Sequence, residues 1–261
     1  MSKTIFFTGA GTGLAKGAAL GLAKKGHHVI ASVENHPQVT SLKEAAAKEN
    51  VVMEIFKMDI TNPADRERMH RYDYDVFVAN AAVNEGGPLG EVPMSAFRNL
   101  FEVNVFSTLE TARIAAAHFV EKRSGKIIFM SSMAGVMASE YTGLYAASKH
   151  ALEAIAKSMY QEMKEFDVQV ATINPGPFST GFNDRAVEEK WEWYDEETHY
   201  TSKKKMKEKD QAMADQYDPA DMIAEMVNII PKDSHKFRTA YPEKTAEAMR
   251  AEEKDNWEKE I

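Results

Sequence analysis

Short apolar runs alternate with longer amphipathic segments along the first 175 residues of the chain. The apolar runs have the length and composition typical of buried strands, and they fall at 4–8, 28–33, 51–56, 75–80, 126–132 and 168–175. The segments with helical spacing fall between them, at 14–26, 37–50, roughly 95–121 and 145–163, with a short helix between the third and fourth strands. This alternation predicts an α/β fold, in which a doubly wound parallel sheet carries helices on both faces.

The chain changes character after Pro177, where charged and aromatic side chains become dense. Segment 178–215 follows the sixth strand at the carboxyl edge of the sheet, so we expect it to form a helical lid over a substrate. The alternative is a solvated helical excursion whose aromatic face packs permanently on the domain. Three further elements follow, a helix at 219–230, a strand at 236–241 and an exposed helical tail at 242–261. Because we find no internal repeat and no low-complexity linker, we expect residues 1–261 to form a single domain.

Composition narrows the classes of partner. The chain has 261 residues, a formal net charge of -8 and a pI of about 5.6. An acidic surface argues against nucleic acid or an anionic membrane as the main partner. The chain contains no cysteine, which excludes disulfides and thiolate metal ligands. No stretch approaches 18 apolar residues. We therefore expect a cytoplasmic protein with no metal site.

The segment TGAGTGLA at 8–15 directly follows the first strand and opens the first helix. Small residues at such a junction let the backbone turn tightly and approach a pyrophosphate, whose charge is favoured by the helix N-terminus. The glycines fit the pattern T-G-x-x-x-G-x-G, with Gly9 and Gly13 in place and Ala15 in the last position. The pattern predicts a dinucleotide site, although an ordinary glycine-rich turn would look similar.

Small or polar residues also end the third and fourth strands. Asp59 follows the third strand, where its carboxylate can accept from an adenine amino group, and Asn80, Ala81 and Ala82 end the fourth strand. Each residue alone has a structural alternative, because Asp and Asn also cap helices. Ligands bind at the carboxyl edge of open α/β sheets, so together these residues favour a nucleotide site there.

The segment YAASK at 145–149 places a phenol and an ammonium on one helix face, because residues i and i+4 are neighbours. We expect the ammonium of Lys149 to lower the pKa of Tyr145 from its ordinary value near 10, towards the range useful for general acid–base catalysis. A surface Tyr-Lys pair is the alternative. Ser132 ends the preceding strand, and its hydroxyl can donate to a substrate carbonyl oxygen. Asn104 lies in the helix that begins near residue 95, where an interior helix amide is the alternative.

In this order, over about residues 4–180, these motifs resemble the short-chain dehydrogenase/reductase family of the one-domain type, which has a Rossmann fold. The resemblance implies a catalytic tetrad. In it Tyr145 is the general acid/base, and Lys149 binds the nicotinamide ribose and lowers the pKa of the phenol. Ser132 holds the reacting oxygen, and Asn104 supports a water in the proton relay. The resemblance also implies that Pro175 to Thr180, within the motif N-P-G-P-F-S-T at 174–180, contact the nicotinamide, with Thr180 near its carboxamide.

The resemblance implies NAD or NADP as the cofactor. We expect it to contact Gly9, Thr12, Gly13, Leu14, Glu34, Asp59, Ile60, Asn80, Ala81, Tyr145, Lys149, Pro175, Gly176, Phe178 and Thr180. Glu34 favours NAD, because a carboxylate at the end of the second strand binds ribose hydroxyls and repels a 2′-phosphate. The aspartate of NAD-dependent relatives falls on Val33, one residue earlier, so the alternative is that Glu34 points to solvent.

The implied activity is an NAD(P)-dependent dehydrogenase or reductase (EC 1.1.1.-) acting on a small alcohol or carbonyl, as a homodimer or homotetramer. The segment KFRTAYPEKT at 236–245 replaces a glycine-ended segment common in the family, so this chain does not have the segment that usually makes the tetramer contacts. A catalytically silent sensor or scaffold is the main rival, but it would be expected to lose Tyr145 or Lys149. A dehalogenase-like relative would lack the nucleotide loop, and an extended lyase or epimerase would need a longer substrate domain. The sequence does not name the substrate.

Overall fold

The computed structural model describes residues 1–212 and 215–260 of the chain. Its centre is a parallel sheet of seven strands in the order β3-β2-β1-β4-β5-β6-β7. The strands are β1 (Thr4–Phe7), β2 (His28–Val33), β3 (Glu54–Lys57), β4 (Val76–Ala79), β5 (Gly125–Met130), β6 (Val168–Pro175) and β7 (Arg238–Tyr241). The order reverses between β1 and β4, which is the topology of a doubly wound sheet and confirms the predicted fold.

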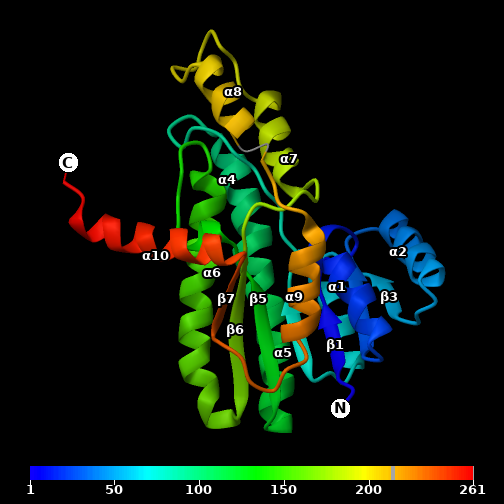
Figure 1. Ribbon diagram of the computed structural model, residues 1–261. Coiled ribbons are helices and arrows are strands. Elements are labelled where there is room, and N and C mark those ends of the chain that lie inside the picture. Colours follow the sequence, from blue (N-terminus) through cyan, green and yellow to red (C-terminus); the bar gives the residue numbers. More distant parts are fainter. Residues whose placement is uncertain (213–214, 261) are drawn as a thin grey trace.

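Helices cover both faces of the sheet (Figure 1). One face packs against α1 (Gly13–Lys24), α2 (His36–Lys48) and α9 (Pro219–Ile229). The other packs against α5 (Thr108–Lys122) and α6 (Gly143–Glu162). Strand residues alternate between the two cores: Ile5 and Phe7 lie in the first and Phe6 in the second. Both faces of the central strands are therefore buried, which explains their almost continuous apolar sequence.

The ends of the first two helices follow from single residues. Gly26 has a left-handed φ of 83° after α1, and the amide of His27 donates to the carbonyl of Leu22 at 3.1 Å. Asn50 has a φ of 54° after α2, and the amide of Val51 donates back to Ala46 at 3.0 Å. Val51 thus belongs to the helix cap, so β3 begins at Glu54, later than the predicted 51–56.

The helix predicted over 95–121 is interrupted. It consists of α4 (Met94–Phe101), a π-helical turn (Glu102–Ser107) and α5. The turn holds the buried side chain of Asn104, and single π-helical turns are frequent at functional sites. The remaining helices are α3 (Pro63–Arg66), α7 (Phe182–Glu188), α8 (Lys203–Ala212), α10 (Glu243–Glu258) and the 3₁₀ turns Glu67–Arg71, Met133–Gly135, Met163–Phe166 and Glu189–Glu192.

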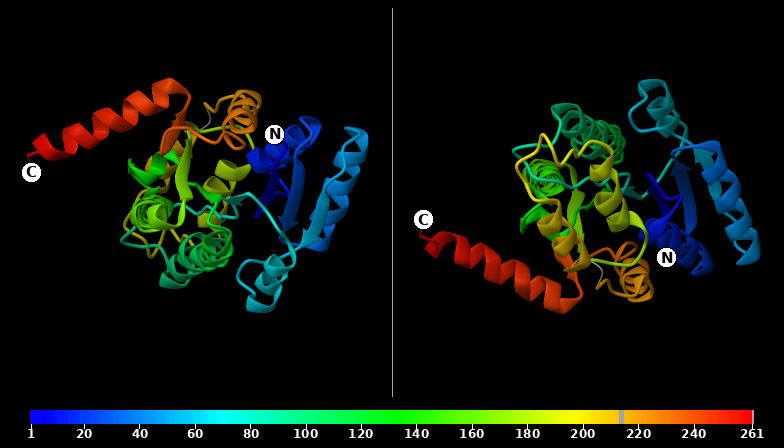
Figure 2. Two further views of the ribbon diagram at one scale, coloured as in Figure 1. Left: turned by 90° about the horizontal axis from the view of Figure 1, so that it is seen from below. Right: turned by 90° about the horizontal axis from the view of Figure 1, so that it is seen from above.

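The predicted lid and tail form two extensions from the body. Helices α7 and α8 stand beyond the carboxyl edge of the sheet, at the top of Figure 1. Residues 213–214 of the segment 178–215 and residue 261 of the tail lie outside the described residues. Figure 2 shows α10 projecting from the body; its inner turns bury Ala246 and Met249, while Trp257 near its end is 92% exposed.

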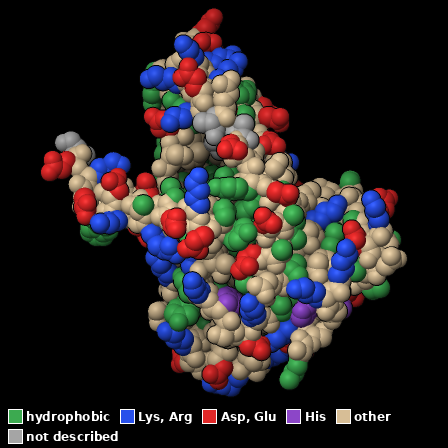
Figure 3. Space-filling model, viewed as in Figure 1, with side chains coloured by type: hydrophobic (Ala, Val, Ile, Leu, Met, Phe, Trp, Pro, Cys, Tyr) green, Lys and Arg blue, Asp and Glu red, His purple; other side chains and the backbone are tan. Residues whose placement is uncertain are grey.

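Charges of both signs are interspersed over the face in Figure 3, so the net negative charge does not gather into one patch there. Over residues 1–212 and 215–260, no helix is both long enough and apolar enough to cross a membrane. The same residues contain no group of three or more His, Asp or Glu side chains arranged to hold a metal ion.

Candidate active site

The ends of β1 and β4 are joined side chain to backbone at the carboxyl edge of the sheet. The hydroxyl of Thr8 accepts from the amides of Asn80 at 3.0 Å and Ala81 at 3.1 Å. The side-chain amide of Asn80 donates in turn to the carbonyls of Thr8 at 3.1 Å and Gly9 at 3.0 Å. This exchange fixes the start of the glycine loop against the end of the neighbouring strand, at the point where the strand order reverses.

The glycine loop has the shape of a phosphate cradle. Gly9 has a φ of 66°, and a Cβ there would lie 2.7 Å from the Cα of Ala81, so only glycine fits. Gly13 has a φ of 60° and faces the side chain of Thr180, 3.6 Å from where its Cβ would be. Thr12 caps α1 without a side-chain hydrogen bond, which leaves amides at the helix N-terminus for an anion. These residues therefore fit a dinucleotide pyrophosphate.

The residues expected near the adenosine lie around the same edge. Asp59 accepts from both the amide and the hydroxyl of Thr61, at 2.9 and 2.7 Å, and Ile60 is buried. Glu34 is exposed and its amide donates to the side chain of Gln38 at 3.1 Å, whereas Val33 is fully buried. The position where NAD-dependent relatives have an aspartate thus points into the core, and the role of Glu34 stays a prediction.

Tyr145, Ser132 and Lys149 converge at the N-terminal part of α6. The ammonium nitrogen of Lys149 lies 5.5 Å from the centre of the Tyr145 ring, which confirms that the two share one helix face. Phe182 of α7 packs edge-on against the same ring at 5.8 Å. The hydroxyl of Ser132 lies beside the phenol and accepts from the amide of Ala134 at 3.1 Å.

The electrostatics of this trio differ from the sequence prediction. Burial raises the pKa of the Tyr145 phenol, and the neighbouring Ser132 hydroxyl only partly opposes this effect. Burial likewise lowers the pKa of Lys149 to about 8, although the carboxylate of Glu153 acts in the opposite direction. The expected lowering of the phenol pKa by Lys149 is thus not met in this geometry, because removing both groups from water has the larger effect.

Asn104 holds a loop to α6. Its side-chain oxygen accepts from the amide of Val83 at 2.8 Å, and its nitrogen donates to the carbonyl of Val83 at 2.9 Å and the hydroxyl of Ser148 at 3.1 Å. Ser148 also donates to the carbonyl of Tyr145 at 2.7 Å. The amide of Asn104 therefore positions the Tyr145 turn and the loop after β4, and its part in a proton relay stays a prediction.

The segment after β6 runs towards the glycine loop. Pro175 ends the strand, and the amide of Gly176 donates to the carbonyl of Tyr241 at 2.9 Å. Phe178 is buried and stacks on the ring of Tyr241, with ring centres 6.4 Å apart. These contacts direct the chain so that Thr180 reaches Gly13.

Sequence reasoning missed several supporting residues. Thr8 was quoted only as part of the glycine motif, yet it joins β1 to β4. Phe182 gave no signal, because its contact with Tyr145 depends on how the arm folds back. Glu153 could have been noticed from its spacing, since it lies four residues after Lys149 on the same helix.

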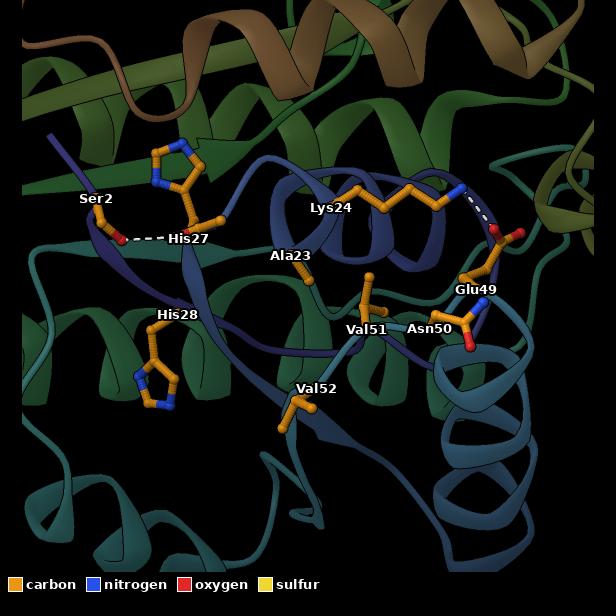
Figure 4. A pocket seen from close by; sticks show the side chains of 10 residues that line it. Ser2, Ala23, Lys24, His27, His28, Glu49, Asn50, Val51 and Val52 are labelled. Carbon is orange, nitrogen blue, oxygen red and sulfur yellow. Dashed lines mark hydrogen bonds and ion pairs between the residues drawn. The ribbon is translucent and has the colours of Figure 1, made fainter.

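Two cavities lie at the opposite edge of the sheet and are poor alternatives. One of about 570 Å³ is lined by residues of the amino-terminal ends, including Ser2, His27 and Asn50 (Figure 4). Its charged groups are already paired, with the ammonium of Lys24 2.5 Å from a carboxylate oxygen of Glu49. A second, of about 210 Å³, lies beside Lys126, which donates to the carbonyl of Lys232 at 2.6 Å.

Comparisons with known proteins identify the family of this chain. A model of the family described as "short chain dehydrogenase" matches residues 3–191. A diacetyl reductase [(S)-acetoin forming] of Staphylococcus epidermidis is 31% identical over 196 residues, which are 72% of this chain and 76% of the relative.

Solved structures of this type cover nearly the whole chain. A short-chain dehydrogenase from Streptomyces avermitilis has a TM-score of 0.83 at 22% identity and covers 99% of this chain and 95% of its own. A short-chain dehydrogenase/reductase from Burkholderia phymatum, solved with NAD, has a TM-score of 0.80 at 18% identity, with 98% and 94% covered. At these identities the likeness supports the fold. With the family match over residues 3–191, it leads to one conclusion: the chain belongs to the short-chain dehydrogenase family.

Proposed function

We propose that the protein transfers a hydride between a nicotinamide cofactor and a small alcohol or carbonyl, with Tyr145 as the general acid/base. The observation that carries this proposal is the convergence of Tyr145, Ser132 and Lys149 beside a glycine loop at one edge of the sheet. The convergence unites a proton-transfer group, a hydrogen-bond donor for the substrate oxygen and a cation, which are the groups that carbonyl reduction requires.

Each residue has one task in this proposal. The Tyr145 hydroxyl gives a proton to the substrate oxygen in reduction and takes it back in oxidation. The Ser132 hydroxyl donates a hydrogen bond to that same oxygen and orients it. Lys149 would hold the ribose hydroxyls. Its ammonium group has three N–H donors, and one of them is used by the carbonyl of Met130 at 2.9 Å, so the others can donate to the ribose. The bound cofactor would supply the hydride donor or acceptor.

The raised phenol pKa affects the two directions differently. A neutral phenol can donate its proton immediately, which favours carbonyl reduction. Oxidation needs the phenolate, and the positive charge of Lys149 is the group placed to stabilise it. Reduction is therefore the direction that the residues support without a prior change of protonation. No described contact favours the alternative of a silent sensor or scaffold.

The function is tested by presenting purified protein with a panel of small ketones, aldehydes and secondary alcohols, while following the absorbance of the reduced cofactor. We expect cofactor-dependent conversion of at least one carbonyl. Cofactor binding with no conversion of any compound would instead support the sensor. Light scattering on the same preparation would test whether the protein is the predicted homodimer or homotetramer. We also propose that the protein is cytoplasmic.

We predict that NADH binds more tightly than NADPH. No lysine or arginine lies in the glycine loop 9–13 or at the end of β2 to hold a 2′-phosphate, and the exposed carboxylate of Glu34 repels one. Calorimetric titration of both cofactors measures the difference. Glu34→Gln should reduce the difference in affinity between NADH and NADPH by improving NADPH binding. Glu44→Gln, an exposed change on α2, should leave this difference unchanged. Tighter binding of NADPH by the wild type would overturn the assignment of Glu34.

We also propose that 178–215 is a substrate lid. Polar contacts connect it to the body: the indole N–H of Trp193 donates to Glu85 at 3.1 Å, the amide of Tyr200 donates to Glu91 at 2.6 Å, and Lys209 pairs with Glu140 at 2.7 Å. Trp193 also packs on a small cluster that includes Leu100 and Leu144. Closure over Tyr145 would exclude water from the reacting groups.

Hydrogen exchange distinguishes this lid from a fixed arm. The amides of α7 and α8 should exchange rapidly in the free protein and slow markedly once cofactor and a substrate analogue are both bound. The amides of α9, which packs in the core, serve as the internal reference and should not change. Equal protection of α7 and α8 in both states would show a permanently docked arm.

A further inference from the structure

A buried ion pair lies directly beneath the candidate active site. Glu153 is 4% exposed and lies on α6, one turn beyond Lys149 and two turns beyond Tyr145. One carboxylate oxygen accepts from the guanidinium of Arg238 on β7 at 2.6 Å. The other accepts from the side-chain amide of Asn174 on β6 at 2.6 Å. A carboxylate so deeply buried is stable only with such partners, so its retention calls for an explanation.

The pair is connected to the end of β5. Asn174, which is fully buried, also donates to the backbone carbonyl of Ser132 at 2.9 Å. Lys149 donates to the carbonyl of Met130 at 2.9 Å. The carbonyls on either side of Ser131 are thus held by two side chains that both face Glu153. Together they fix the backbone from which the Ser132 hydroxyl projects.

The turn after Ser132 packs on the side chain of Glu153. A Cβ on Gly135 would come within 2.9 Å of the Glu153 side chain and within 2.5 Å of the Ser131 hydroxyl. The absence of a side chain at Gly135 therefore lets the 3₁₀ turn Met133–Gly135 settle on α6 at Glu153. Any shift of Glu153 would be transmitted to this turn and so to Ser132.

We propose that Glu153, held by Arg238, is a positioning residue that keeps Ser132 in place through Asn174 and keeps Lys149 positively charged; this inference rests on the proposed function. Its contribution to Lys149 is electrostatic. The charged groups that face Glu153 are Arg238 from β7 and Lys149 from its own helix. The carboxylate favours the ammonium form, against the burial that lowers the pKa of Lys149 to about 8.

The test is the pH profile of carbonyl reduction by Glu153→Gln, which keeps the side-chain shape and an acceptor for Asn174. Lys149 is charged below its pKa. Loss of the neighbouring negative charge lowers that pKa, so activity is lost at lower pH. The alkaline limb of kcat/KM should move down by roughly one pH unit. Glu162→Gln, at the exposed end of the same helix, is the control, and the alkaline limb of its kcat/KM profile should fall at the same pH as in the wild type.

A second variant keeps the test decisive if Glu153→Gln folds poorly. The double variant Glu153→Gln/Arg238→Met removes both members of the ion pair, so that the Arg238 guanidinium is not left without its carboxylate, and it should show the same shifted alkaline limb. A wild-type limb in the folded single or double variant would overturn the positioning role. Failure of the proposed function gives a different result, because either the wild type would convert no carbonyl of the panel or Tyr145→Phe would remain active.

Discussion

Replacing Tyr145 by phenylalanine is expected to abolish turnover while cofactor affinity and folding are retained. In the proposed function the phenol donates the proton to the substrate oxygen, and a general acid/base of this kind contributes roughly 10²–10⁴-fold to the rate. Phenylalanine preserves the ring, which packs against Phe182 at 5.8 Å. Steady-state assays of the variant, with calorimetry of cofactor binding, measure both parts of the expectation.

The matched control is Tyr160→Phe, further along the same helix, where the ring packs on Phe237 away from the site. This variant should retain wild-type activity. Turnover by Tyr145→Phe within about tenfold of wild type would show that the proton comes from another group, because the loss would then fall below the range of general acid catalysis.

Replacing Lys149 by methionine is expected to abolish turnover and, at neutral pH, to stabilise the protein. Lys149 is 3% exposed, and its pKa is lowered from 10.5 to about 8, so the folded protein carries a charge that burial disfavours. A shift of this size corresponds to a cost of roughly 3 kcal/mol while the amine is protonated in both states. Replacing Lys149 removes this cost but also removes the hydrogen bond to the carbonyl of Met130. The variant should therefore gain about 2 kcal/mol in the free energy of unfolding.

The gain should depend on pH with a definite sign. Below about pH 8 the folded and unfolded states both bind the proton, so the wild type bears the full cost. As the pH rises from 8 towards 10.5, the folded state loses its proton first and the cost disappears. Urea unfolding at pH 7 and pH 10 should therefore show the advantage of the variant shrinking. Lys157→Met, an exposed change on α6, should show no such dependence, and a Lys149→Met advantage equal at both pH values would contradict the buried-charge account.

The fold was predictable because its signals are local. The strand runs are apolar on both faces, as buried parallel strands require, and Gly26 marks the end of α1 through its left-handed backbone. The start of β3 was missed because the cap of α2 extends to Val51, and the break at Asn104 was missed because a π-helical turn leaves no clear pattern in the sequence.

The candidate site was predictable in its residues and less so in its electrostatics. Tyr145 and Lys149 share a face by helix spacing alone. Their pKa values depend on burial by α7 and the sheet, which the local sequence does not show. The partners of Glu153 come from β6 and β7, which lie 21 and 85 residues further along the chain. Such contacts follow only once the strand order is known.

Transfer of deuterium from the cofactor to the product tests the central claim most directly. The protein would be incubated with the active carbonyl from the panel and with nicotinamide cofactor carrying deuterium at the reactive carbon of the reduced ring. Mass spectrometry of the alcohol product then shows whether the new hydrogen came from the cofactor. The proposed function predicts one deuterium bound to the former carbonyl carbon, with wild-type protein and not with Tyr145→Phe. A product without deuterium, or deuterated product formed equally well by Tyr145→Phe, would contradict it.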